Sequence, residues 1–161
     1  MRNKKVLPVA LLLLIAGITL SRVAQGADDP NTGTWRLNVA KSKFNPGPGP
    51  KSKILTIKIE NGTETYNAQG IDASGRETLE TYKAKLDGTD APVDGIPFAD
   101  TVSNRQLAPN HLVTTFKKNG AVTMTLDIVV SPDGMTRMLT YTGKNERGRK
   151  VHDVLVFDKE T

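Results

Sequence analysis

The chain has 161 residues, with 22 lysine and arginine residues against 17 acidic ones, two histidines and no cysteine. The lack of cysteine excludes disulfides, thiol catalysis and cysteine-ligated zinc. Four of the basic residues and none of the acidic ones lie in residues 1–26, so the remainder carries 18 basic against 17 acidic residues. So small an excess of positive charge provides no general attraction to a phosphate backbone, and we expect no nucleic-acid binding.

The N-terminal segment has the order of a secretory signal peptide. Basic residues precede an almost unbroken apolar run over residues 6–20, and Ala24-Gln25-Gly26 places small residues where a signal peptidase cuts. The apolar run is shorter than the roughly 20 residues that cross a bilayer, and Pro8 lies inside it. We therefore expect cleavage near Gly26, a periplasmic or secreted location, and a single mature domain of residues 27–161 without a membrane anchor.

Alternating hydrophobicity runs through the remainder of the chain. Apolar side chains occupy every second position from Val122 to Val130, as in a strand with one buried face, and residues 54–60 alternate in the same way. The pattern predicts about nine strands, at residues 33–38, 54–60, 62–71, 76–86, 101–107, 111–117, 121–131, 136–143 and 151–157.

Turn sequences separate these strands at short intervals. Asn61-Gly62, Asp87-Gly88 and Asn119-Gly120 all tolerate the left-handed backbone of a tight hairpin. Many short strands joined by hairpins predict an all-β domain. We favour an antiparallel up-and-down barrel of about 8–10 strands, because closure removes exposed edges, with a β-sandwich as the alternative.

Two proline-rich segments interrupt the succession of strands. Residues 45–50, Asn-Pro-Gly-Pro-Gly-Pro, are predicted to form an extended connection, because proline excludes them from a helix or a central strand. Residues 91–97 contain two further prolines and are predicted to form a rigid bend.

Few residues of the chain point to a reaction. The sequence contains no Gly-x-Ser-x-Gly motif, phosphate-binding loop or calcium loop, so we expect no enzyme, no cofactor and no metal site. His111 and His152 have no acidic cluster at ligand spacing and are interpreted as structural or surface histidines. Trp35, the only tryptophan, is interpreted as a core residue that closes one end of the domain.

Two groups of charged residues have a structural and a functional interpretation. The aspartates at positions 87, 90, 94 and 100 lie among glycine and proline and are interpreted as turn formers, with cation binding as the alternative. The basic residues near the last hairpin are interpreted as solubilising charge, with contact to an anion or a lipid headgroup as the alternative; they are Lys144, Arg147, Arg149 and Lys150.

An eight- to ten-stranded barrel is either filled by side chains or wide enough for one small ligand. The residues predicted to line such a cavity are the apolar face of the clearest strand and three further large side chains: Val122, Met124, Leu126, Ile128, Tyr82, Phe116 and Met138. The same side chains also fit a solid core.

Both ends of the mature chain resemble known barrels. Gly33-Thr34-Trp35 resembles the Gly-x-Trp opening of the lipocalin and fatty-acid-binding (calycin) barrels, and Val154–Lys159 resembles their closing strand. A longer similarity, which includes residues 33–50, is to exported bacterial proteins of unknown function that are termed lipocalin-like. The resemblance implies an antiparallel barrel around one small apolar ligand, with a late arginine, Arg147 or Arg149, against Trp35.

The chain also departs from these families. Fatty-acid-binding proteins have two helices after the first strand, where this chain has residues 46–50, and their closing strand carries an Arg-x-Tyr carboxylate grip, where this chain has Leu155-Val156-Phe157. Overall the sequence predicts a periplasmic or secreted binding protein for a small apolar or amphipathic ligand. The alternative is a cell-envelope protein-interaction module with a filled barrel and no internal ligand.

Overall fold

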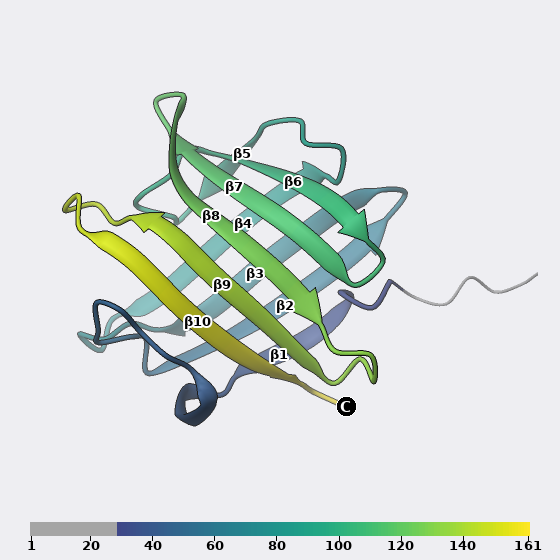
Figure 1. Cartoon of the computed structure of the whole chain (residues 1–161), viewed down its shortest axis with the longest axis horizontal. Helices are drawn as coiled ribbons and strands as arrows, with labels where there is room; N and C mark the ends of the chain where they lie inside the picture. The colour runs from purple at the N-terminus through teal and green to yellow at the C-terminus, as the bar shows by residue number, and fades with distance from the viewer. Residues whose placement is uncertain (1–28) are drawn as a thin grey trace, which may run out of the picture.

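A computed structural model describes residues 29–161, which form a closed barrel of ten antiparallel strands (Figure 1). The expected signal peptide, residues 1–26, lies outside the described residues. A short 3-10 helix, η1 (Val39–Lys41), follows the first strand. The strands are β1 (Gly33–Leu37), β2 (Ser52–Glu60), β3 (Thr63–Ile71), β4 (Glu77–Lys85), β5 (Ala91–Asp94), β6 (Thr101–Ala108), β7 (His111–Lys118), β8 (Ala121–Val130), β9 (Thr136–Lys144) and β10 (Lys150–Lys159).

The topology is up-and-down: each strand pairs with its neighbours in the chain, and β1 also pairs with β10 to close the barrel. This confirms the predicted barrel. In the region described, no helix is long and apolar enough to cross a membrane.

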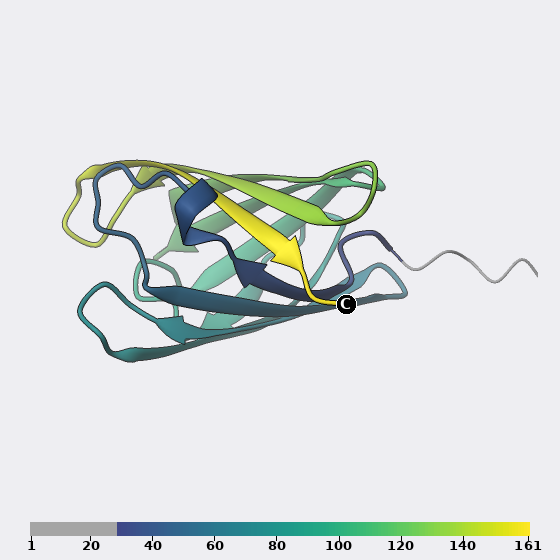
Figure 2. The same cartoon turned by 90° about the horizontal axis from the view of Figure 1, so that it is seen from below.

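The turns gather at two opposite ends of the barrel (Figures 1 and 2). We call one the mouth end; it carries residues 44–50, the β3–β4 turn and the β9–β10 turn at the left of both views. The other, the floor end, carries residues 29–32, the β2–β3 and β8–β9 turns and the C-terminus.

Period-two alternation directs the apolar side chains into the barrel. On β8, Met124, Leu126 and Ile128 are each at most 4% exposed, whereas Asp127 between them faces the solvent. The same parity applies to β10, where Leu155 and Phe157 face inward. The buried face of every long strand thus contributes to one common core.

The segment at residues 91–97 corrects one prediction. Ala91–Asp94 form strand β5 and are not a bend. The strand is short, with two paired positions toward β4 and two toward β6. Pro92 is compatible with it because the fixed φ of proline suits an extended chain and few ladder bonds are involved. Gly95 then ends the strand at φ 74°, where a Cβ atom would collide with the Leu79 carbonyl oxygen.

Candidate ligand-binding site

Two adjoining spaces lead from the mouth end into the barrel. The outer one, the mouth hollow, has a volume of about 460 Å³, and the inner cavity has about 60 Å³. Four residues line both spaces and form the neck between them: Lys53, Glu80, Phe98 and Tyr141. The two spaces therefore adjoin each other at these four side chains.

The proline-rich connection forms one wall of the mouth hollow. Phe44, Pro46, Pro48 and Pro50 all line it. Hydrogen bonds hold this connection against β10: the Asn45 backbone N–H donates to the Asp153 carboxylate at 2.6 Å, and the His152 N–H donates to the Asn45 carbonyl at 2.7 Å. The mouth wall is thus fixed to the barrel.

Aromatic side chains form much of the wall of the inner cavity. The rings of Tyr66 and Tyr82, opposite each other on β3 and β4, are stacked with centroids 4.5 Å apart. Phe116 meets Tyr82 edge-on at 6.5 Å, and Phe98 meets Phe116 edge-on at 5.5 Å. Burial raises the pKa values of Tyr66, Tyr82 and Tyr141, so the phenols remain protonated hydrogen-bond donors.

An ion pair crosses the neck. Lys53 Nζ lies 2.6 Å from Glu80 Oε2, and the Tyr66 hydroxyl donates to the same oxygen at 3.4 Å. The lysine and glutamate side chains are 13% and 19% exposed, so water reaches both. The alternation along β2 explains the position of the lysine, because Lys53 lies on the same inward face as Leu55 and Ile57.

A second pair of opposite charges lies deeper, at what we call the polar floor. Arg137 Nη2 and Glu64 Oε1 are 3.9 Å apart, and both side chains are only 1% exposed. The other carboxylate oxygen, Glu64 Oε2, accepts a hydrogen bond from the Asn104 amide at 2.5 Å. Thr114 in turn donates to the side-chain amide oxygen of Asn104, Oδ1, at 2.9 Å. Neutral side chains therefore hold the carboxylate in place.

Arg137 also contacts the segment that closes the floor. Its Nη1 donates to the Asn31 carbonyl at 3.3 Å, and Trp35 Nε1 donates to the same carbonyl at 3.0 Å. The guanidinium lies 6.0 Å from the centroid of the Trp35 ring, and Trp35 is fully buried. Arg137, on β9, is thus the late arginine against the tryptophan. The expected candidates, Arg147 and Arg149, are instead exposed at the β9–β10 turn.

Two atoms of the polar floor have no hydrogen-bond partner among residues 29–161: Glu64 Oε1 and Arg137 Nε. Burial raises the pKa of Glu64 above its usual value and the charge of Asp29 adds to the rise, while Arg137 and the nearby Tyr82 hydroxyl lower it in part. Buried polar atoms without partners are rare in folded proteins. The interior of this barrel consequently holds one acceptor and one donor that remain available.

The structure brings most of the predicted lining residues to this site. Tyr82, Phe116, Leu126 and Ile128 line the inner cavity, and Met124 lines the mouth hollow.

The prediction that Val122 and Met138 line the inside of the barrel is wrong. Both side chains face outward and are 61% and 43% exposed. Near Val122, Phe116 pairs with Met124 while Lys117 pairs with Val122, so β8 has a bulge that reverses the parity before Met124. Met138 lies between the inward-facing Arg137 and Leu139, and therefore points out.

The polar floor and the neck were missed in the sequence, although a signal for them exists. Glu64 lies two positions before Tyr66 on β3, and Arg137 two positions before Leu139 on β9. An inward apolar residue implies that its neighbour two positions away is also inward, whether or not it is charged. Applied to charged residues, this rule places both in the barrel.

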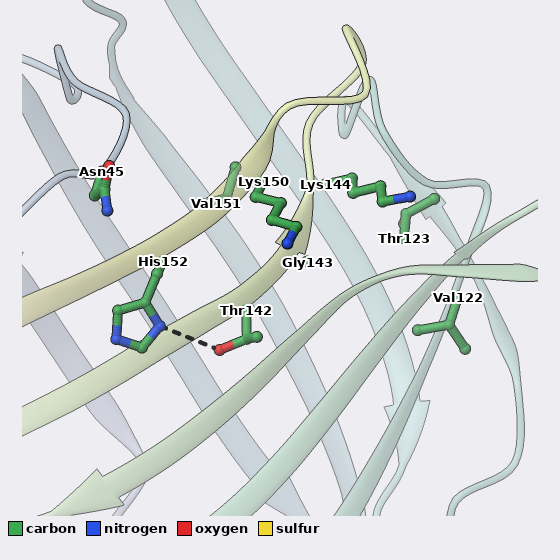
Figure 3. A pocket seen from close by; sticks show the side chains of 9 residues that line it. All are labelled: Asn45, Val122, Thr123, Thr142, Gly143, Lys144, Lys150, Val151 and His152. Carbon is green, nitrogen blue, oxygen red and sulfur yellow. Dashed lines mark hydrogen bonds between the residues drawn. The ribbon is translucent and has the colours of Figure 1, made fainter.

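A further hollow, of about 600 Å³, lies on the outside of the barrel over β8, β9 and β10 (Figure 3). The long side chains of Lys144 and Lys150 extend over it, and His152 contacts the Thr142 hydroxyl at 3.5 Å. It is open and lacks a buried polar group. His111, on the non-adjacent strand β7, pairs instead with Asp127 at 2.6 Å, so the two histidines do not meet.

Three of the four clustered aspartates have local partners. Asp87 accepts from the Thr89 backbone N–H, Asp100 accepts from the Asn119 N–H, and Asp90 pairs with Lys117 at 2.8 Å. Within residues 29–161, no three histidine, aspartate or glutamate side chains converge as a metal site would require.

No protein-family model matches this sequence, and no curated protein is significantly similar to it. The closed ten-stranded antiparallel barrel is compatible with a lipocalin-like calycin fold.

Proposed function

We propose that this protein is a binding protein for a small amphipathic molecule, which enters at the mouth hollow and extends through the neck into the inner cavity. The observation that carries the proposal is that a mouth hollow of about 460 Å³ shares four lining residues with an inner cavity that has aromatic walls and Arg137 at its base. Small-molecule sites are typically concave, mainly apolar, and provided with a few well-placed polar groups.

The two volumes determine which part of the ligand occupies each space. An inner cavity of about 60 Å³ has room for a few waters, or for a group of a few atoms. The bulk of the ligand therefore remains in the mouth hollow, against Phe44 and the prolines of the connection. A molecule with an apolar body and a small polar end matches this division.

The same proposal includes the cellular setting. The basic start, apolar run and small residues of positions 1–26 support export to the periplasm or the medium. The barrel, together with the Gly33-Thr34-Trp35 opening, supports placement among the exported lipocalin-like proteins. We further propose that the chain acts without a catalytic step or a cofactor.

Native mass spectrometry on the chain, expressed with residues 1–26 intact and purified from the compartment to which it is exported, tests this proposal. We expect an additional mass that is lost on denaturation and recovered in an organic extract. The variant Phe98→Ala removes a neck wall and should lower affinity for the extracted ligand at least tenfold. Val122→Ala, on the outer surface, is the matched control and should bind normally.

A bare mass that persists after incubation with cell-envelope extract would overturn the carrier proposal and favour the interaction module with no internal ligand. Equal loss of affinity in Phe98→Ala and Val122→Ala would move the site out of the barrel.

A further inference from the structure

The polar floor lacks one hydrogen-bond donor and one acceptor. Glu64 Oε1 is an acceptor without a donor, and Arg137 Nε is a donor without an acceptor. The two side chains do not satisfy each other, because 3.9 Å between Arg137 Nη2 and Glu64 Oε1 is too long for a hydrogen bond. A group that serves both atoms must itself donate and accept.

The inner cavity reaches one member of this pair, Arg137. Arg137 lines the inner cavity together with Tyr82 and Leu139, and Glu64 lies beside its guanidinium. A small polar group at the bottom of the inner cavity therefore meets Arg137, and Glu64 lies behind that guanidinium without lining the cavity. With about 60 Å³ available, that group consists of only a few atoms.

Charge balance restricts what this group can be. The polar floor contains one cation and one anion, Arg137 and Glu64, and the neck contains one of each, Lys53 and Glu80. Burial raises the pKa of Glu64, whereas Arg137 and the hydrogen bond from the Asn104 side-chain amide favour its ionised form. A charged ligand group would add an uncompensated charge to a buried site, where desolvation strongly opposes it.

We propose that the inner cavity receives an uncharged hydroxyl or amide group of the ligand, hydrogen-bonded between Arg137 and Glu64, so that the ligands are neutral alcohols or amides. This inference rests on the proposed function and specifies its ligand class. It separates the site from one for fatty-acid anions, which would place a second carboxylate next to Glu64.

Four probes with the same ten-carbon chain test the inference: 1-decanol, decanamide, decanoate and decylamine. Trp35, the only tryptophan, adjoins Arg137, so its fluorescence reports occupation of the floor. The Nε–H resonance of Arg137 in a proton–nitrogen spectrum reports the new hydrogen bond directly. At pH 7 we expect decanol and decanamide to bind at least tenfold more tightly than decanoate and decylamine, and to shift the Arg137 resonance.

Glu64→Gln removes the negative charge of the polar floor with little change in the shape of the side chain. It leaves Arg137 as an uncompensated cation, so we expect decanoate affinity to rise at least tenfold relative to decanol. Glu60→Gln is the matched control: Glu60 is 63% exposed and pairs with Lys58 on the surface. Its ligand preference should equal that of the wild type. Circular dichroism shows whether each variant retains the fold.

The outcomes separate the two proposals. If decanoate or decylamine binds the wild type as tightly as decanol, and Phe98→Ala weakens that binding, then the barrel is a carrier and the inference of a neutral ligand is wrong. If the Glu64→Gln variant folds but keeps the wild-type order, the charge-balance argument is wrong. If none of the four probes binds, the proposed function itself fails for single-chain amphiphiles.

Discussion

The barrel contains two pairs of opposite charges, one at the neck and one at the polar floor, and they differ in nearly every respect. Lys53 and Glu80 approach to 2.6 Å and are partly exposed. Arg137 and Glu64 are 3.9 Å apart, almost fully buried, and bonded mainly to neutral groups. The neck pair is a close ion pair that water partly reaches, whereas the floor pair is buried and has two polar atoms without hydrogen-bond partners.

The depth of an ion pair within the barrel determines how strongly each charge depends on its partner. Water reaches both charges at the neck, so their attraction is partly screened and the loss of one partner costs less than at the floor. At the floor no such solvation exists, and each charge depends on the other and on its hydrogen bonds. The predictions below test this difference.

Removal of the floor cation should have the largest effect. Arg137→Met leaves Glu64 buried without a counter-charge, and we expect a loss of about 3–5 kcal/mol in the free energy of unfolding at pH 7. Urea denaturation followed by circular dichroism measures it. The double variant Glu64→Met with Arg137→Met should recover most of the loss, because replacing both partners by apolar side chains is often neutral. A loss below about 1 kcal/mol in Arg137→Met alone would contradict the proposed difference between the floor and the neck.

The cost of Arg137→Met should depend on pH. The pKa of Glu64 in the folded state lies above its ordinary value of 4.5, because burial disfavours the charged form, so the folded state keeps this proton to a higher pH than the unfolded state does. The ionised carboxylate therefore costs stability above the folded pKa, and that cost disappears as pH falls toward 4.5. Without Arg137 the pKa of Glu64 in the folded state rises further, and a tenfold change in its proton affinity corresponds to about 1.4 kcal/mol. Unfolding curves between neutral and mildly acidic pH should converge with those of the double variant.

Disruption of the neck pair should have a smaller effect. Glu80→Gln keeps the size of the side chain and its contact with the Tyr66 hydroxyl, and water can solvate the remaining lysine. We expect a loss of about 1–2 kcal/mol, between the values for exposed and buried pairs. Added salt should reduce the difference from the wild type at the neck more than at the floor. If Glu80→Gln lowers the free energy of unfolding as much as Arg137→Met does, the neck and the floor do not differ in the way described.

Changes on the outer wall should have almost no effect. Val122→Thr and Met138→Thr alter side chains that are 61% and 43% exposed, and we expect changes within about 0.5 kcal/mol. The same denaturation assay provides the comparison. A loss of about 2 kcal/mol or more for either would place that side chain inside the barrel, contrary to the structure.

Much of the fold was predictable because it follows from local signals. Period-two alternation and hairpin turns locate nine of the ten strands, and only β5 was missed, since Pro92 conceals a strand of four residues. The lining residues on β8 follow from the same alternation as far as Met124. The bulge between β7 and β8 then reverses it, and this irregularity depends on pairing with another strand.

The polar floor was less accessible to prediction, because its members come from strands far apart in the sequence. Glu64, Asn104 and Arg137 lie on β3, β6 and β9, and only barrel closure brings them together. Each also contradicts the expectation that charged and polar side chains face solvent. Parity with Tyr66 and Leu139 would have placed the two charged residues inside, but their mutual contact and their unpartnered atoms require the three-dimensional arrangement.

The pairing of β1 with β10 has a kinetic consequence. Every other ladder joins strands that follow each other in the chain, whereas this one brings Trp35 next to Lys159. Local hairpins form quickly, while contacts between distant residues must first offset the entropy of a long loop. We therefore expect this seam to form last during folding and to open first, so that its amide protons exchange with solvent sooner than those of the β2–β3 or β7–β8 hairpins.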